Sequence, residues 1–120
     1  MRALTVTVYA LFGTLALVAG VVALATPGVI VSEASASPLI AHLTREEGAA
    51  FVFIGLMFYW CLAHYEQRRP IHLAFLAFII LFAGIHWHDY LQSQRDIMSR
   101  VINTIPVLLL AVTSPFAREH

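Results

Sequence analysis

The sequence predicts an all-α integral membrane protein, built as an up-down-up-down four-helix bundle with a short fourth helix. Three observations lead to this prediction: 60% of the 120 residues are hydrophobic, only 12% are charged, and the apolar residues fall into four runs. In a soluble domain about a quarter of the residues are charged. A globular core of this size could not hide so much apolar surface behind so few charged side chains, so a bilayer is the expected solvent.

Charge and cysteine content exclude several other classes of protein. All seven basic residues are arginine and the formal net charge is zero, so the chain has no basic stripe for nucleic acid. The lone Cys61 excludes a disulfide framework and a cysteine-rich metal site. The partners we expect are the lipid bilayer and other membrane proteins, and not nucleic acid.

The runs predict one transmembrane domain, residues 1–120, with helices at about 3–26, 44–65, 70–90 and 101–116. The first run, from Ala3 to Ala25, is long enough at about 1.5 Å per residue to cross a hydrocarbon core of about 30 Å. It also resembles a secretory signal, but it is longer than the usual apolar region, and the cleavage-like Ala36 lies well beyond its end. We therefore expect a retained first helix that ends before Pro27.

The segments between the runs predict where the next helices begin. The stretch 32–38 is rich in serine and predicts an extended loop. Thr44 and Glu47 have the spacing of a capping box, which predicts that the second helix begins near Thr44. A polar turn, 66–70, separates the second helix from the third, and Pro70 stands where a helix can begin but not continue.

The fourth run, from Val101 to Phe116, contains several polar residues and a proline. Its clean apolar stretch extends only from Val107 to Val112. Pro106 lies in its first turns, where a missing N–H matters least. We expect a short fourth span, with a helix lying in the membrane interface as the alternative.

Arginine placement predicts the orientation of the chain. If the amino terminus is cytoplasmic, the inner arginines are Arg2, Arg68, Arg69 and Arg118, and the outer ones are Arg45, Arg95 and Arg100. The short turn with Arg68 and Arg69 adjoins the membrane and is the stronger cue. We expect a bacterial inner-membrane protein with both termini in the cytoplasm.

Small residues recur along one face of each of the first three helices, which predicts close helix packing. These faces are Gly13, Ala16, Gly20 and Ala23 in the first helix, Gly48, Val52, Gly55 and Tyr59 in the second, and Ala74, Ala77, Leu81, Gly84 and His88 in the third. Short connections make neighbouring helices antiparallel, so a compact bundle is expected.

Two histidines flank the turn between the second and third helices. His64 and His72 lie at helix ends, where an imidazole can stay hydrated. Two histidines at similar depth on neighbouring antiparallel helices could ligate a haem axially. His64 and His72 are therefore the cofactor-binding candidates, although the sequence specifies no cofactor.

A second polar group is predicted at the outer ends of the second and third helices. His88 continues the small face of the third helix and is the histidine expected to point into the bundle. With Glu46 and Glu47 it forms the catalytic candidate set, an acid–base group above an apolar cavity. His42, Glu47 and His88 are the metal candidates, because imidazole and carboxylate suit zinc, iron or manganese. The alternative is a solvated polar cap, hydrogen-bonded to nearby arginines.

The chain resembles small four-helix bacterial inner-membrane proteins of unknown function, including the DoxX-like group. The residues that carry the resemblance are Pro27, Arg45, Gly55-Leu56, Arg69-Pro70 and Phe82-Ala83-Gly84. It extends from Ala3 to Val112 and implies the four-helix fold. It defines no catalytic or binding residue, and the segment from His86 to Asp89 is not part of the pattern.

Two functions remain open at this point. The first is a non-enzymatic accessory subunit that packs through its helices against a larger membrane complex or forms a homo-oligomer. This hypothesis is favoured because no catalytic motif and no charge near the middle of the membrane is present. The second is a membrane enzyme or a binder of a lipophilic ligand or cofactor, with the polar site of His88 and Glu46 or Glu47 at its mouth.

Overall fold

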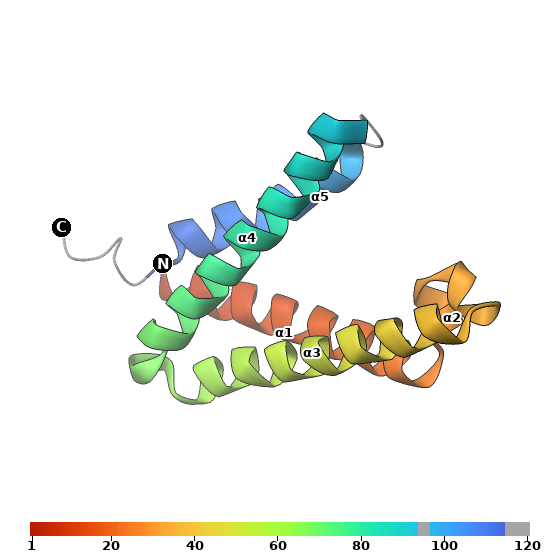
Figure 1. The fold of residues 1–120 in the computed structure, drawn as a ribbon. Helices are drawn as coiled ribbons and strands as arrows, with labels where there is room; N and C mark the ends of the chain where they lie inside the picture. Colours follow the sequence, from red (N-terminus) through yellow and green to blue (C-terminus); the bar gives the residue numbers. More distant parts are fainter. Residues whose placement is uncertain (94–96, 115–120) are drawn as a thin grey trace. The chain divides into compact units, whose positions relative to one another are not determined.

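The computed structural model describes residues 1–93 and 97–114. Four long helices form the fold (Figure 1): α1 (Arg2–Ala25), α3 (Pro38–Ala63), α4 (Arg69–Ser93) and α5 (Ile97–Val112). The shorter elements are α2 (Pro27–Ile30) and the 3-10 turns η1 (Ser32–Ser35) and η2 (Tyr65–Gln67). No strand occurs among the described residues, and the all-α prediction is confirmed for them.

Three of the described helices are long and apolar enough to cross a membrane: Arg2–Ala25, Pro38–Ala63 and Arg69–Asp89. The apolar helix Arg100–Val112 is shorter, as the sequence predicted for the fourth run. The protein itself covers little of these helices. Only 33%, 22% and 17% of the most apolar stretch of α1, α3 and α4 is buried, so most of this apolar surface faces outward.

The second long helix begins at Pro38, six residues before the predicted start at Thr44. Ser37 is its N-cap and accepts a hydrogen bond from the Ile40 N–H at 3.3 Å. Pro38 occupies the first turn, where no N–H is needed. Thr44 lies inside the helix, and its hydroxyl donates to the Ile40 carbonyl at 2.8 Å. The predicted capping box of Thr44 and Glu47 is therefore wrong.

The segment before α3 is also more regular than predicted. The turn η1 replaces most of the extended loop expected at 32–38, and the short helix α2 precedes it. The Val31 N–H donates to the Pro27 carbonyl at 2.9 Å, and the Ala34 N–H donates to the Val31 carbonyl at 3.0 Å. Serine and proline there begin short helical turns, because both residues suit the first positions of a helix.

The later helices also differ from their predicted limits. α4 extends to Ser93, three residues beyond the expected end, and α5 begins at Ile97 and ends at Val112. Residues 115 and 116 of the predicted fourth helix lie outside the described residues. Arg95 and Arg118, which the predicted orientation uses, lie outside them as well.

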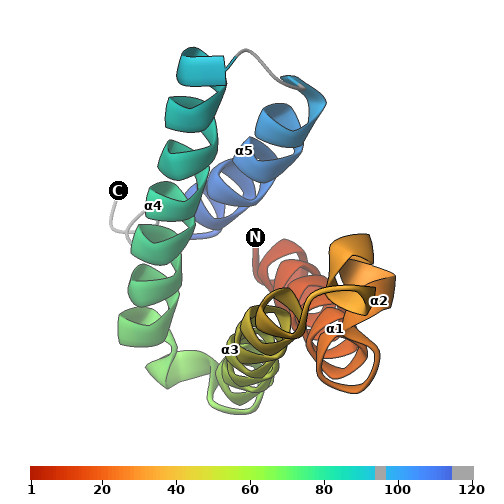
Figure 2. The same ribbon diagram turned by 45° about the vertical axis from the view of Figure 1, so that its right-hand side comes forward.

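The chain divides into two compact units, Val6–His64 and Met1–Thr5 with Tyr65–His120. In the first unit α1 and α3 lie side by side (Figure 2). A Cβ on Gly20 would lie 2.7 Å from the Gly48 carbonyl oxygen, and a Cβ on Gly55 would lie 2.9 Å from the Gly13 oxygen. These pairs run in opposite directions along the two helices, so α1 and α3 are antiparallel. The small faces predicted for these helices are confirmed as their contact faces.

Aromatic residues extend the contact between α1 and α3. The Phe58 ring lies 5.7 Å from the Tyr9 ring and 5.9 Å from the Phe12 ring, between centroids. Tyr59 Oη lies 2.7 Å from Thr14 Oγ1. Since the Thr14 hydroxyl donates to the Ala10 carbonyl at 2.8 Å, the Tyr59 hydroxyl is the donor to Thr14. The glycines let the backbones approach, and these side chains fill the space beside them.

In the second unit α4 and α5 form an antiparallel pair. Near the start of α4, His72 Nε2 lies 2.9 Å from the Leu110 carbonyl oxygen. Near its end, Trp87 Nε1 donates to Thr104 Oγ1 at 3.0 Å. The first contact is buried and the second is exposed, and both join the two helices.

The small face predicted for the third helix is exposed. A Cβ on Gly84 would have no atom within 4 Å, and Leu81 is 69% exposed. At 100° per residue, Leu81 lies about 180° around α4 from His72, which faces α5. The small face of α4 is therefore the side opposite to α5.

Candidate functional site

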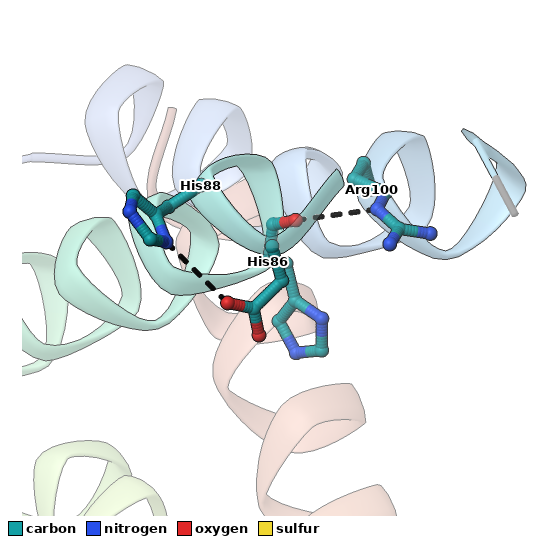
Figure 3. Close-up of polar contacts among 4 residues, drawn as sticks. His86, His88 and Arg100 are labelled. Carbon is teal, nitrogen blue, oxygen red and sulfur yellow. Dashed lines mark hydrogen bonds and ion pairs between the residues drawn. The ribbon is translucent and has the colours of Figure 1, made fainter. Parts of the chain in front are cut away.

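The polar residues at the end of α4 form two separate contacts (Figure 3). His88 Nδ1 lies 3.4 Å from Asp89 Oδ1, and both side chains are exposed, that of His88 to 71%. Arg100 reaches from α5, and its Nε donates to the His86 carbonyl at 3.2 Å. Arg100 is buried, whereas His88 is not. His88 thus points to solvent in this structure, where the sequence predicted that it would point into the bundle.

The His86 ring has a different neighbour from the His88 ring. It meets the Phe82 ring edge-on, with 4.8 Å between the centroids and 63° between the planes. Its backbone carbonyl lies inside α4, seven residues before the end at Ser93, and accepts a hydrogen bond from Arg100 of α5. Arg100 therefore joins α5 to α4 about two turns before the end of α4.

The acidic end of the predicted site lies on α3. His42 Nε2 is 3.3 Å from Glu46 Oε1, one helical turn away, and both side chains are largely exposed. Glu47 and Arg45 are exposed as well. An imidazole beside a carboxylate can relay a proton, but in this exposed position water competes for both groups.

The candidates are therefore divided between the two units of the chain. His42, Glu46 and Glu47 lie on α3 in Val6–His64, and His88 lies on α4 in the other unit. No group of three or more His, Cys, Asp or Glu side chains that could hold a metal ion occurs among residues 1–93 and 97–114. The metal set of His42, Glu47 and His88 and the catalytic set of His88, Glu46 and Glu47 stay predictions.

The two cofactor candidates also have contacts of their own. His64 follows α3, where its ring stacks on Trp60 at 4.4 Å and its Nδ1 lies 3.2 Å from the Trp60 carbonyl oxygen. His72 is fully buried, and its Nε2 donates to Leu110, whose carbonyl belongs to the last turn of α5. The prediction that His72 stays hydrated is wrong, because α5 covers it. The haem-ligand hypothesis for His64 and His72 stays a prediction.

Sequence reasoning missed one cluster, formed by Arg2, Tyr65 and Arg68. Tyr65 and Arg68 are buried, although the sequence indicated only a polar turn here. A signal was present, since an aromatic residue three positions before an arginine can stack with it in a tight turn.

No family model, no curated protein and no solved structure matches the chain.

Proposed function

We propose that the chain is a membrane-spanning accessory subunit that packs through its helices against a larger membrane protein complex. The outward-facing apolar surface of α1, α3 and α4 supports insertion, because lipid is the solvent that covers such surface without cost. Under this proposal α1, α3 and α4 cross the bacterial inner membrane, and the shorter α5 is the fourth span of an up-down-up-down bundle. Both termini are in the cytoplasm, with Arg2, Arg68 and Arg69 on the inner side.

The observation that carries the accessory role is the exposure of the small face of α4, which lies opposite to α5 and is called the outer face below. Large apolar side chains on and beside it, Leu81 and Ile85, are 69% and 60% exposed, and Gly84 lies among them with open space above it. On α1 and α3, glycines allow the backbone of one helix to come within van der Waals distance of the other. A helix of a partner protein fits this face better than lipid does, because a small residue allows close backbone approach.

The test is site-directed cross-linking in native membranes. In a Cys61→Ala background, Leu81→Cys carries a photoreactive maleimide on the outer face of α4. The expected product is an adduct with a larger polypeptide, identified by mass spectrometry. Val18→Cys is the matched control, because Val18 is exposed to 57% on α1 and should label lipid.

An adduct of two copies of this 13.3 kDa chain would show that the partner on this face is a second copy, as in a homo-oligomer, and not a larger complex. Labelling of lipid alone from Leu81→Cys would reject the accessory role.

The resemblance to DoxX-like proteins stays a prediction, and it neither requires nor excludes a partner.

A second candidate function is favoured by the imidazole–carboxylate pair of His42 and Glu46. A membrane enzyme or a lipophilic-ligand binder could use this pair, with Glu47 and His88, as an acid–base group. His88→Ala and His42→Ala would abolish ligand binding or activity under this function, whereas the accessory role predicts unchanged assembly. An absorption spectrum, elemental analysis and lipid analysis of the purified chain would reveal a bound cofactor, metal or lipid.

A further inference from the structure

Two arginines contact one tyrosine ring at the turn before α4. The guanidinium carbon of Arg68 lies 3.7 Å from the centroid of the Tyr65 ring, and that of Arg2 lies 4.8 Å from it. Arg68 Nη1 also donates to the Tyr65 carbonyl at 2.6 Å. All three residues belong to one compact unit, Met1–Thr5 with Tyr65–His120. Cation–π contacts thus gather two positive charges on one aromatic side chain.

These two charges have no acidic partner in the described part of the chain. Neither Arg2 nor Arg68 forms an ion pair there, and Glu66, the acid nearest in sequence, is exposed. Arg68 is only 6% exposed. A buried cation costs free energy unless an anion or several hydrogen bonds compensate it. Arg2 is exposed and adds like charge beside the same ring.

Two buried polar atoms of the cluster also lack a hydrogen-bond partner. They are Arg68 Nε and Tyr65 Oη, and Tyr65 is only 8% exposed. Buried donors in folded proteins are rarely left unpaired. Both groups can donate, so one acceptor with several oxygens would satisfy the hydrogen bonds as well as the charges.

A phosphate group has the required chemistry. Its oxygens match the planar donors of guanidinium groups and can reach more than two donors at once. α4 begins at Arg69, so the positive end of its dipole lies at the same turn. We propose that Arg2, Tyr65 and Arg68 form a binding site for a phosphate group.

An anionic phospholipid and inorganic phosphate both present this group. The lipid source rests on the proposed membrane insertion, because the cluster lies at the first turn of α1 and just before α4, where helices of spanning length would meet the headgroups. Anionic lipids attract arginines near the membrane surface. Inorganic phosphate requires no insertion, so the two sources can be separated by experiment.

The test uses the full chain, purified in a neutral detergent. Native mass spectrometry counts bound phosphatidylglycerol, and diacylglycerol with the same acyl chains serves as the phosphate-free probe. Equilibrium dialysis measures the binding of radiolabelled inorganic phosphate. The expected result is saturable binding of phosphatidylglycerol at one per chain, with little diacylglycerol bound. Binding of inorganic phosphate with the same dependence on Arg2 would support the site and identify free phosphate as a ligand.

Substitutions connect the binding to the cluster. Arg2→Gln and Arg68→Gln should each weaken phosphate binding about tenfold, the expected effect of losing one charge-assisted contact. Tyr65→Phe keeps the ring and removes only the hydroxyl, so it tests the site even if Arg68→Gln does not fold. Arg45→Gln removes an equal charge from an exposed position on α3 and should leave binding unchanged.

The proposal would be overturned if Arg2→Gln and Tyr65→Phe bound phosphatidylglycerol and inorganic phosphate as well as the parent chain does. It would also be overturned if the parent chain bound neither. Cross-linking from Leu81→Cys does not involve this cluster. Failure of phosphate binding with that cross-link intact would therefore reject the site and leave the accessory role standing.

Discussion

His72 on α4 donates its Nε2–H to the Leu110 carbonyl on α5 at 2.9 Å, and both residues are fully buried. Leu110 lies in the last turn of α5, where carbonyl groups lack a partner within the helix. The Ser114 N–H, which could have reached Leu110, donates instead to the Ala111 carbonyl at 3.2 Å. The histidine of one helix therefore caps the carboxyl end of the other and fixes the register of the pair.

Replacing His72 with Phe should destabilise the α4–α5 pair by about 1 kcal/mol, because the buried Leu110 carbonyl then keeps only the longer 3.4 Å contact from the Thr113 hydroxyl. His72→Gln keeps a donor and should recover part of the loss. Reversible unfolding in mixed micelles, followed by circular dichroism, measures the difference. His64→Ala is the control, since the exposed His64 contacts only its own helix, and a change within about 0.5 kcal/mol is expected. An equal loss in both variants would contradict the capping role.

Gly20 and Gly84 should respond in opposite ways to alanine. A Cβ on Gly20 would lie 2.7 Å from the Gly48 oxygen and the Val52 nitrogen, and these backbone atoms can move only if α1 and α3 separate. Gly20→Ala should therefore cost about 1–3 kcal/mol of unfolding free energy. Gly84→Ala meets open space and should be neutral or stabilising by up to about 1 kcal/mol, through helix propensity. The same unfolding measurement on both variants tests this difference. A Gly20→Ala protein as stable as the parent chain would disprove the close contact between α1 and α3.

Much of the helical organisation could be predicted from the sequence. The long apolar runs require helices of membrane-spanning length, and glycines seven residues apart, such as Gly13 and Gly20, repeat every two turns on one side. The start of α3 was missed because two start signals compete. Ser37 with Pro38 is the signal the chain uses, whereas Thr44 with Glu47 has the same kind of spacing inside the helix.

The contacts of the candidate residues could not be predicted in the same way. The burial of His72 depends on Leu110, 38 positions away, and apolar residues surround α4 so evenly that no periodicity indicates which side α5 covers. The position of Arg68 depends on a turn, η2, whose geometry brings Tyr65 under its guanidinium group. Residue type alone indicated solvated charges there.

Glu33 in η1 should titrate at an unusually low pH. Its carboxylate accepts a hydrogen bond from its own backbone N–H, which lowers the pKa most, and from the Ser32 hydroxyl at 3.1 Å. Because the pKa is lower in the folded turn than in the unfolded chain, the turn gains stability above the ordinary glutamate pKa. That gain is lost as the pH falls through the lowered value. Ser32→Ala should raise the pKa only in part, as measured by NMR titration of the Glu33 side chain. A pKa at or above the ordinary value in the parent chain would contradict the hydrogen bonds.

The hydrogen bond between Tyr59 and Thr14 should contribute a small, measurable coupling between α3 and α1. Tyr59→Phe and Thr14→Val each remove one partner of the 2.7 Å contact and nearly preserve side-chain volume. Polar contacts between membrane helices are worth about 0.6 kcal/mol on average, so a double-mutant cycle should give a coupling of about that size. Unfolding in mixed micelles provides the four free energies. The single variants should also destabilise the protein less than Gly20→Ala does, because they remove a contact without forcing the backbones apart. A coupling of zero would mean that backbone approach at the glycines, and not this bond, holds α1 against α3.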